Sequence, residues 1–386
     1  MVMKTSICTF LISLLGLVGF AQQDQNQADL DALYQAIQKM PSYKKLLKGN
    51  AGYQQLYEEV KGKVKDADEK TTFKELSRLL YAINDNHLGF YRTPDSTLKA
   101  AYVSLPINTD SLKIQLAQKG KDELEGIYHL GEHDFGLYTT DQQHYKMVLL
   151  KNGILMSEII KTPYGGYDCI QYAGRNVPYQ LIKNIKLVNG ALIGTPFVKT
   201  KKKSFSALTK STENFEYKLL DQDIGYLRLS NFGSNHVNIK KSEEFFKTLN
   251  GGLASRCLIV DLRNNPGGGY KTSQKFIDLL KKYKGKIFIL QNAQTVSNAE
   301  QVIIELKDQK NVVTLGEQSK GMITFGSNYG KNVLLPSGRF TFYPTDMNGI
   351  DKELAYESKG INPDVLLDPY KGDWIEQTLE YIKKTP

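Results

Sequence analysis

Cys257-Leu-Ile-Val-Asp-Leu-Arg-Asn-Asn-Pro-Gly-Gly-Gly269 is the stretch that says most about how this chain folds. Leu258 to Val260 form a short apolar run with the length of a buried strand. The strand would open into the glycine run and bring unshielded backbone N–H groups to the C-terminal edge of a sheet, where open α/β sheets bind ligands. Such groups suit an anion or a developing oxyanion. A plain strand-to-helix turn has the same composition, so both interpretations stand at this point.

Strands and helices alternate on both sides of this stretch. Apolar runs and their spacing predict strands over 224–230, 258–261, 287–290 and 312–315, helices over 237–249, 272–283 and 299–307, and a last helix over about 373–383. This alternation indicates parallel β-α units. We therefore expect an α/β core over residues 215–386.

The sequence before residue 215 shows two other patterns, one helical and one of short β-strands. Apolar residues recur at helical spacing after the first 21 residues, which predicts a helical segment over 22–99. Residues 100–214 instead contain short β-type runs separated by turns, among them Lys151-Asn-Gly153 and Val188-Asn-Gly190. This pattern predicts a separate, mostly antiparallel β-domain, either a barrel or a sandwich.

The first 21 residues have the features of a signal peptide. Lys4 supplies a positive charge, Thr9 to Phe20 supply an apolar segment too short to span a bilayer, and Ala21 ends a cleavage site that contains small residues. We expect residues 1–21 to be removed. The mature chain is then expected to have no membrane span and to be exported, either to the periplasm or into the medium.

Composition narrows the classes of partner. The chain is 41% hydrophobic and 24% charged, which is typical of a soluble globular protein. Its net charge of +9 is concentrated in basic runs at Lys201–Lys203 and Lys281–Lys286. No aromatic-interleaved basic motif accompanies these runs, so a nucleic-acid partner is not predicted. No Cys or His spacing resembles a zinc site, and we predict neither a metal nor a cofactor.

Ser297 lies in Gln294-Thr-Val-Ser-Asn-Ala-Glu300, between a predicted strand and a predicted helix. A Ser followed three residues later by Glu fits a helix capping box. A Ser at a helix N-terminus is also well placed as a nucleophile, because the positive helix end and the N–H of Asn298 lie next to its hydroxyl. The sequence alone leaves both roles open.

Two other side chains could help to activate such a serine, since its hydroxyl is a weak nucleophile until a base takes the proton. His87 lies in a compact Asn-Asp-Asn-His-Leu-Gly segment after a predicted helix, whereas the other four His lie in strand, turn or helix-start contexts. Glu357 precedes a Gly/Pro turn and could orient a histidine. Either could equally be an ordinary solvated residue. The segment Gly316-Glu-Gln-Ser-Lys-Gly321 directly follows the last predicted strand, where its glycines permit a tight turn beside the sheet edge.

Four motifs in this order resemble the tail-specific, or C-terminal processing, peptidase family, which includes the tricorn protease core. They are Asp-Leu-Arg-Asn-Asn-Pro-Gly-Gly (261–268), Thr-Val-Ser-Asn-Ala-Glu (295–300), Gly-Glu-Gln-Ser-Lys-Gly (316–321) and Glu-Ser-Lys-Gly-Ile-Asn-Pro-Asp (357–364). The resemblance covers the chain from about 215 to 370. It implies an α/β core of the ClpP/crotonase-like kind, with Ser297 as nucleophile. It also implies that the amides of Gly267 or Gly268 and of Asn298 form the oxyanion hole.

The resemblance implies two ways of activating the serine. Bacterial processing peptidases of this family use a Lys at the position that is Met322 here, and Lys320 lies two residues earlier. The tricorn branch uses a His from an upstream Asp-x-His segment, matched by His87, and a Glu before a Gly-x-x-Pro-Asp turn, matched by Glu357. Where that branch has a Ser before the His, this chain has Asn86.

We therefore expect an exported serine endopeptidase that hydrolyses polypeptides through Ser297, with His87 as base and Glu357 orienting the site. A Ser–Lys peptidase with Lys320 as base is one alternative. The other is a non-catalytic peptide- or glycan-binding protein on a degenerate peptidase scaffold, which the two departures from the family's pattern would favour. Residues 100–214 lack the glycine-rich loop of a PDZ domain, so substrate capture by that route is not predicted.

Overall fold

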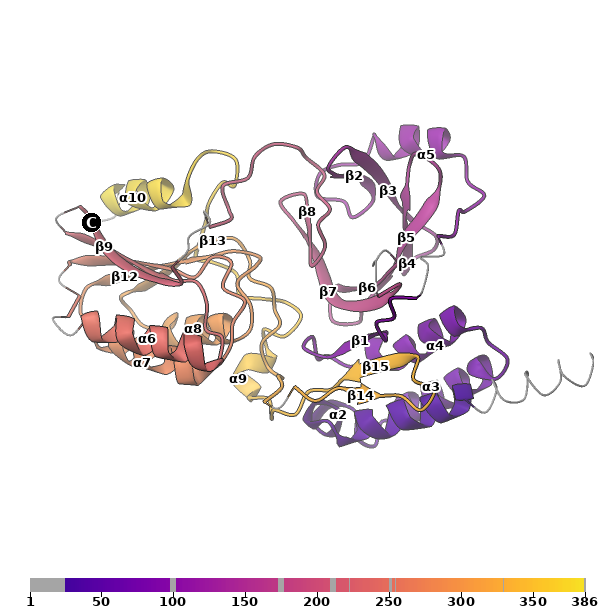
Figure 1. Ribbon diagram of the computed structural model, residues 1–386. Helices are drawn as coiled ribbons and strands as arrows, with labels where there is room; N and C mark the ends of the chain where they lie inside the picture. Colours follow the sequence, from indigo (N-terminus) through magenta and orange to yellow (C-terminus); the bar gives the residue numbers. More distant parts are fainter. Residues whose placement is uncertain are drawn as a thin grey trace, which may run out of the picture. The chain divides into compact units, whose positions relative to one another are not determined.

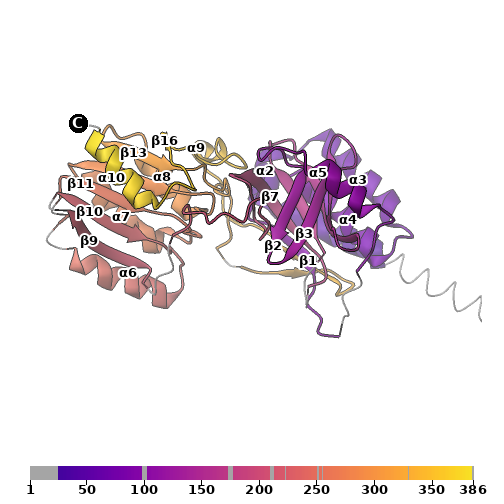
Figure 2. The ribbon, with the colours of Figure 1, turned by 90° about the horizontal axis from the view of Figure 1, so that it is seen from above.

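The computed structural model describes residues 25–97, 102–172, 177–208, 213–221, 223–249, 252–253, 255–328 and 330–384. The predicted signal peptide, residues 1–21, lies outside these ranges. The chain forms two compact units (Figures 1 and 2). The first contains the described residues up to 115 together with 135–183 and 325–349, and the second contains 116–134, 184–324 and 350–384.

Helices make up the N-terminal part of the first unit. They are a helix over residues 25–39, α2 (Pro41–Leu46), α3 (Ala51–Val64) and α4 (Glu69–Tyr81). The side chain of Asn50 accepts a hydrogen bond from the Tyr53 N–H at the start of α3, and the side chain of Asp68 does the same for Thr71 at the start of α4. The helical character predicted for the N-terminal part is confirmed.

An antiparallel sheet is the other main part of the first unit. Its strands are hydrogen-bonded in the order β14-β15-β1-β7-β6-β5-β4-β3. Their bounds are β1 (Gly89–Arg92), β3 (His133–Thr139), β4 (His144–Leu149), β5 (Ile154–Lys161), β6 (Tyr167–Gln171), β7 (Gln180–Val188), β14 (Val333–Leu334) and β15 (Phe340–Tyr343). The sheet packs on the helices through aromatic rings: Phe73 of α4 stacks on Phe90 of β1 with 4.6 Å between ring centroids. The prediction of mostly antiparallel β-structure in this part of the chain is confirmed.

The strand β7 ends in the second unit, where it forms a hairpin with β8 (Ala191–Ile193). Val188 pairs with Ala191, and the two residues between them, Asn189 and Gly190, have φ of 49° and 76°. Two successive left-handed residues make the turn that matches the twist of paired strands. The turn predicted at Val188-Asn-Gly190 is therefore confirmed.

The second unit is built on a sheet with strands in the order β16-β13-β12-β11-β10-β9. Their bounds are β9 (Phe215–Asp221), β10 (Ile224–Leu229), β11 (Cys257–Asp261), β12 (Lys286–Gln291), β13 (Val312–Gly316) and β16 (Val365–Leu366). All neighbours from β10 to β16 pair in parallel, and β9 pairs antiparallel at the edge. The connecting helices are α6 (His236–Thr248), α7 (Tyr270–Lys282) and α8 (Asn298–Leu306), and α10 (Trp374–Lys384) ends the described chain. The predicted α/β core is confirmed.

Helices cover both faces of this sheet. Figures 1 and 2 show α6, α7 and α8 on one face and α10 on the other. Leu258 and Val260 of β11 join the core cluster on the side of α7 and α8, whereas Cys257 and Ile259 join the cluster that contains Trp374. Burial on both faces explains why this strand is an unbroken apolar run.

Each compact unit combines segments that the predicted boundaries at 99/100 and 214/215 assign to different parts of the chain. Residues 325–349, predicted as part of the core, supply β14 and β15 to the first unit. β15 pairs antiparallel with β1, and Phe342 lies opposite Phe90. The division of the chain into four successive segments stays a prediction.

The remaining elements are short. They are α5 (Thr109–Leu116), β2 (Gly126–Leu130) and α9 (Asp351–Leu354). Within the described ranges, no helix is both long enough and apolar enough to cross a membrane.

Candidate active site

Ser297 lies where β12 leads into α8, beyond the C-terminal end of a parallel strand. It is the N-cap of α8, with φ 58° and ψ −123°, a conformation that a residue other than glycine rarely adopts. Thr295 fixes the approach, because its hydroxyl donates to the Leu262 carbonyl and accepts from the Asn292 N–H, both at 3.0 Å. The tight turn thus presents a serine at the positive end of a helix.

The glycine run after β11 lies directly against this serine. A Cβ placed on Gly267 would be 2.7 Å from the Cβ of Ser297 and 2.9 Å from the backbone nitrogen of Asn298, so a side chain does not fit. Gly267 also has a φ of 83°, which favours glycine. The two loops are joined by a hydrogen bond of 3.0 Å from the Val296 N–H to the Asn265 carbonyl. Residues from the ends of β11 and β12 therefore meet at one point.

The three amides predicted for the oxyanion hole differ in their partners. The Gly267 N–H donates to Oδ1 of the buried Asn265 at 2.8 Å, and Nδ2 of Asn265 donates to the Leu229 carbonyl at 2.8 Å. The N–H groups of Gly268 and Asn298 have no protein acceptor within the described part of the chain. Gly268 is solvent-exposed, and Asn298 opens α8, where the first N–H groups of a helix lack partners. These two N–H groups can donate hydrogen bonds to a negatively charged ligand atom.

Glu300 is a fully buried carboxylate that ties the serine to a neighbouring loop. It accepts hydrogen bonds from the N–H of Ser297 (3.0 Å), the hydroxyl of Ser319 (2.6 Å), and the N–H groups of Gly321 (2.6 Å) and Met322 (3.1 Å). Burial raises the pKa of Glu300, and these donors act in the opposite direction. The predicted capping box is present, and the same carboxylate also fixes the loop after β13.

Glu357 is likewise buried and holds the continuation of that loop. Its Oε2 accepts from the N–H groups of Ile323 and Thr324, both at 2.8 Å. Two backbone segments pass close to each other here: a Cβ placed on Gly321 would be only 2.4 Å from the nitrogen of Gly360. Glu300 and Glu357 thus bind adjoining stretches of one loop.

Lys320 and Met322 lie on this loop with different roles. The Lys320 side chain is buried, and its Nζ donates to the carbonyl of Asn184 on β7. Nδ2 of Asn184 donates in turn to the carbonyls of Lys320 and Gly321, both at 3.1 Å. Met322 lies two residues after Lys320, and its N–H donates to Glu300 at 3.1 Å.

His87 belongs to the first unit, where it follows α4. Its N–H donates to Oδ1 of Asp85 at 3.2 Å, and Oδ2 of Asp85 accepts from the hydroxyl of Thr345 at 2.5 Å. Burial raises the pKa of Asp85 and lowers the pKa of His87 to about 4. The imidazole is therefore neutral at pH 7, the form in which it can accept a proton.

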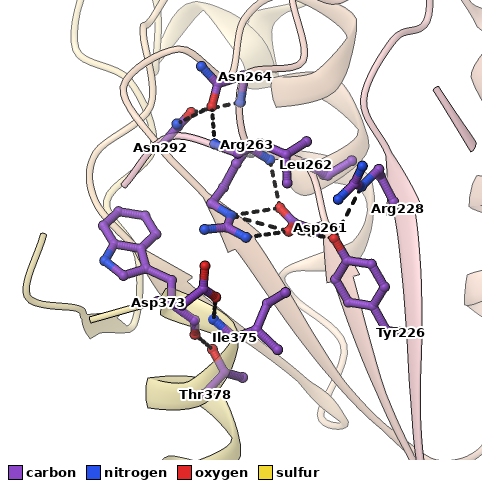
Figure 3. A network of polar contacts seen from close by, with 12 residues as sticks. Tyr226, Arg228, Asp261, Leu262, Arg263, Asn264, Asn292, Asp373, Ile375 and Thr378 are labelled. Atoms are coloured by element: carbon purple, nitrogen blue, oxygen red, sulfur yellow. Dashed lines mark hydrogen bonds and ion pairs between the residues drawn. The ribbon is translucent and has the colours of Figure 1, made fainter. Parts of the chain in front are cut away.

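A buried ion pair anchors the strand from which the glycine run starts (Figure 3). The guanidinium of Arg263 binds the carboxylate of Asp261 through Nη2 at 2.7 Å and Nε at 2.9 Å, with side-chain exposures of 1% and 0%. The Tyr226 hydroxyl donates to the same carboxylate at 3.0 Å from the neighbouring strand. The Arg263 guanidinium also lies 5.9 Å from the Trp374 ring. The polar residues at the start of the motif thus fix the loop that meets Ser297.

The structure places most of the predicted site residues in the second unit: Ser297, Gly267, Gly268, Asn298, Lys320 and Glu357. His87 lies in the first unit. Asn265 takes part in the site without having been singled out by the sequence. The sequence offers no means of telling it from its neighbour Asn264, because both are Asn in the same loop.

The comparison with protein families finds a match to the stretch of the chain that contains most of the candidate site. The model of peptidase family S41 matches residues 223–282 and 269–367, which include the glycine run, Ser297, Lys320 and Glu357. This part of the chain belongs to peptidase family S41. It is a serine-type peptidase, as the sequence predicted. His87 lies outside the matched residues of this S41 peptidase.

Several solved structures resemble this S41 peptidase at low identity. The photosystem II D1 C-terminal processing protease is 16% identical, with 89% of this chain and 93% of that chain covered and a TM-score of 0.39. Mature CPAF is 10% identical, with 94% and 97% covered and a TM-score of 0.46. The tricorn protease is 12% identical, with 94% and 37% covered and a TM-score of 0.44. Among curated proteins, no relative matches the sequence.

Proposed function

We propose that this S41 peptidase is an exported serine endopeptidase that cleaves polypeptides through Ser297, with His87 as general base and Glu357 orienting the site. The observation that carries the proposal is the junction of Gly267 with Ser297 and Asn298, where a Cβ on the glycine would be 2.7 Å from the serine Cβ. This junction joins a hydroxyl, a helix N-terminus and the N–H groups of Gly268 and Asn298, for which the described residues supply no acceptor.

The proposed reaction uses each group once per half-reaction. The Ser297 hydroxyl attacks the peptide carbonyl carbon, and its proton passes to the neutral imidazole of His87. The oxyanion of the tetrahedral intermediate accepts from the N–H groups of Gly268 and Asn298. We assign Gly268 rather than Gly267 because the Gly267 N–H already donates to Asn265. The C–N bond then breaks as His87 protonates the leaving amine, and water hydrolyses the acyl-enzyme ester by the same steps.

The contacts of the lysine alternative support the choice of histidine. The Nζ of Lys320 donates to the Asn184 carbonyl, so one of its protons is directed at the backbone of β7. A lysine base must lose its charge to act, whereas burial already keeps His87 neutral at pH 7. The matched experiment compares His87→Gln and Lys320→Met with His236→Gln, a change at an exposed histidine of α6. Loss of turnover in the first variant alone supports the histidine, and loss in the second alone rejects it.

Ser297→Ala tests the central assignment. Peptide hydrolysis should fall at least about a thousandfold, because the attacking oxygen is removed. Labelling by a serine-reactive phosphonate should disappear with it. Ser273→Ala is the control, since Ser273 is buried in α7 of the same unit and its hydroxyl has no partner among the described residues. A Ser297→Ala protein that still hydrolyses peptide, or a wild-type protein that no phosphonate labels, would refute the assignment.

The apolar N-terminal segment supports export, which completes the proposal. N-terminal sequencing of the protein from its native host should find a chain that starts near Gln22, in the periplasm or the medium. A chain that keeps residues 1–21 and stays inside the cell would refute export and leave the peptidase assignment standing.

A further inference from the structure

Asn298 directly follows the serine, and its side chain is held from one side. The residue is buried, and its Nδ2 donates to Oε1 of Gln301 at 2.8 Å, one turn further along α8. The Oδ1 of Asn298 has no hydrogen-bond partner among the described residues. Within the described part of the chain, the bond to Gln301 is therefore the only hydrogen bond of this side chain.

Gln301 is in turn held by a carboxylate from another helix. Its Nε2 donates to Oε1 of Glu353 at 3.0 Å, and Glu353 is a buried residue of α9. An ionised carboxylate accepts hydrogen bonds and cannot donate them, so it sets the orientation of the Gln301 amide. The amide nitrogen of Gln301 faces Glu353, and its oxygen faces Asn298. The carboxylate thus determines which end of each amide donates.

The helix α9 also leads into the turn that carries Glu357. The Tyr356 N–H donates to the Glu353 carbonyl at 2.9 Å. The Glu357 N–H donates to the Leu354 carbonyl at 3.3 Å. The hydrogen bonds from Asn298 to Glu353 therefore join the residue after the serine to the segment that precedes Glu357.

We propose that Gln301 and Glu353 are positioning residues of the peptidase site, whose hydrogen bonds hold the side chain of Asn298 and thereby its N–H, the proposed oxyanion donor. Such a donor must be held in place before the oxyanion forms, because a displacement of about 1 Å costs much of the rate. The inference rests on the proposed function for its effect on turnover, and on the hydrogen bonds alone for its effect on stability. Both residues act through Asn298 and exchange no proton with the substrate.

Exchanging the two functional groups tests the proposal. In Gln301→Glu two carboxylates face each other and repel, so we expect kcat at pH 7 to fall about tenfold with a smaller change in KM. In the double variant Gln301→Glu with Glu353→Gln, the carboxylate at position 301 accepts from the Asn298 side chain and from the amide at position 353. We therefore expect the double variant to recover most of the loss.

The matched control is Gln274→Glu on α7. Gln274 is exposed, and its Nε2 donates to Oδ1 of Asp278 at 2.9 Å, so the same change places two carboxylates together far from the proposed hydrogen bonds in sequence. This variant should keep wild-type kinetics. Normal kinetics in Gln301→Glu, or a double variant no more active than Gln301→Glu, would overturn the proposal.

The pH dependence of Gln301→Glu gives the role a signature. A proton between the two carboxyl groups restores a hydrogen bond, and like charges raise the pKa of the pair above that of an ordinary glutamate. Activity relative to wild type should therefore fall as the pH rises through this raised pKa, and the double variant should show no such fall. Burial and the carboxylates of Glu353 and Glu305 raise the pKa of Tyr270 in α7 to about 12, so this phenol stays neutral. The cation of α9, Lys352, donates to a backbone carbonyl of α8 at 3.1 Å.

Stability tests the same contacts without any activity. With a raised pKa the folded Gln301→Glu protein binds more protons than its unfolded chain, so it should lose stability as the pH rises from the ordinary pKa of glutamate through the raised one. Urea unfolding in the Ser297→Ala background, with and without Glu353→Gln, measures this loss. The same pH dependence in the single and the double variant would overturn the proposal. If Ser297→Ala retains activity, the proposed function fails while this measurement still decides the contact between Gln301 and Glu353.

Discussion

Gly267 and Ser297 lie so close that their packing excludes a methyl group: a Cβ on Gly267 would be 2.7 Å from the serine Cβ and equally close to the Val296 carbonyl oxygen. The contact joins the loops that follow β11 and β12. It explains why the motif needs glycine at this position, since the residue adopts a φ of 83° and has no room for a side chain beside Ser297.

Gly267→Ala should nearly abolish turnover. The added methyl must displace Ser297 or the nitrogen of Asn298, so we expect kcat/KM to fall at least about a hundredfold, as for loss of an oxyanion donor. Peptide hydrolysis and phosphonate labelling measure the effect. The control is Gly62→Ala in α3, where a Cβ meets nothing within 4 Å and should stabilise the helix by about 0.5–1 kcal/mol. Normal turnover in Gly267→Ala would contradict the proposed geometry.

The pH dependence of kcat/KM should identify the base. With His87 at a pKa of about 4, a neutral imidazole predominates above that pH, so activity should rise at acidic pH and be level by pH 7. The pKa of Glu300 is raised by burial. If protonation of Glu300 also lowers activity at acidic pH, the midpoint of that decline should therefore lie above the ordinary pKa of a glutamate. A profile that keeps rising through pH 8 would instead indicate a lysine base.

Arg263→Met should destabilise the second unit strongly. It leaves the buried charge of Asp261 without its cation, which costs about 3–5 kcal/mol in comparable buried pairs. Arg263→Lys keeps the charge but loses the two-pronged contact, so we expect an intermediate loss. Urea denaturation followed by circular dichroism measures both. Equal stabilities of the two variants would contradict this account, because only Arg263→Lys keeps a positive charge beside Asp261.

A matching prediction concerns the segment that carries His87. The Nζ of Lys183 donates to Asp168 (2.6 Å) and to the carbonyls of Leu80 (2.9 Å) and Ile83 (3.3 Å), and so fastens the end of α4 to the sheet. Lys183→Met should lower the free energy of unfolding by about 3–5 kcal/mol.

The control for this change is Lys161→Met, at an exposed lysine of β5. The double variant Lys183→Met with Asp168→Leu should recover part of the loss, because no charge is then left buried. A double variant that is less stable than Lys183→Met would contradict this account.

Local patterns account for what the sequence could predict. The alternating strands and helices after residue 215, the capping box at Ser297 and the turn at Val188-Asn-Gly190 each depend on neighbours in the chain, and each is confirmed. The Gly267 contact also has a local cause, since successive parallel strands bring their following loops to one sheet edge.

The features that sequence could not supply are those made by distant segments. The pairing of β1 with β15 places Phe90 opposite Phe342. Nothing in the sequence of either segment indicates that the other is its partner. Likewise, nothing in the pair Asn264-Asn265 indicates that the side chain of Asn265 accepts the hydrogen bond from the Gly267 N–H.

The interleaving of the two compact units has a practical and an evolutionary consequence. The chain passes between them at 115/116, 134/135, 183/184, 324/325 and 349/350, so neither unit corresponds to one uninterrupted stretch of gene. A fragment cut at any single boundary would lack strands of its own sheet. A single continuous segment of the gene therefore cannot transfer either unit whole to another protein.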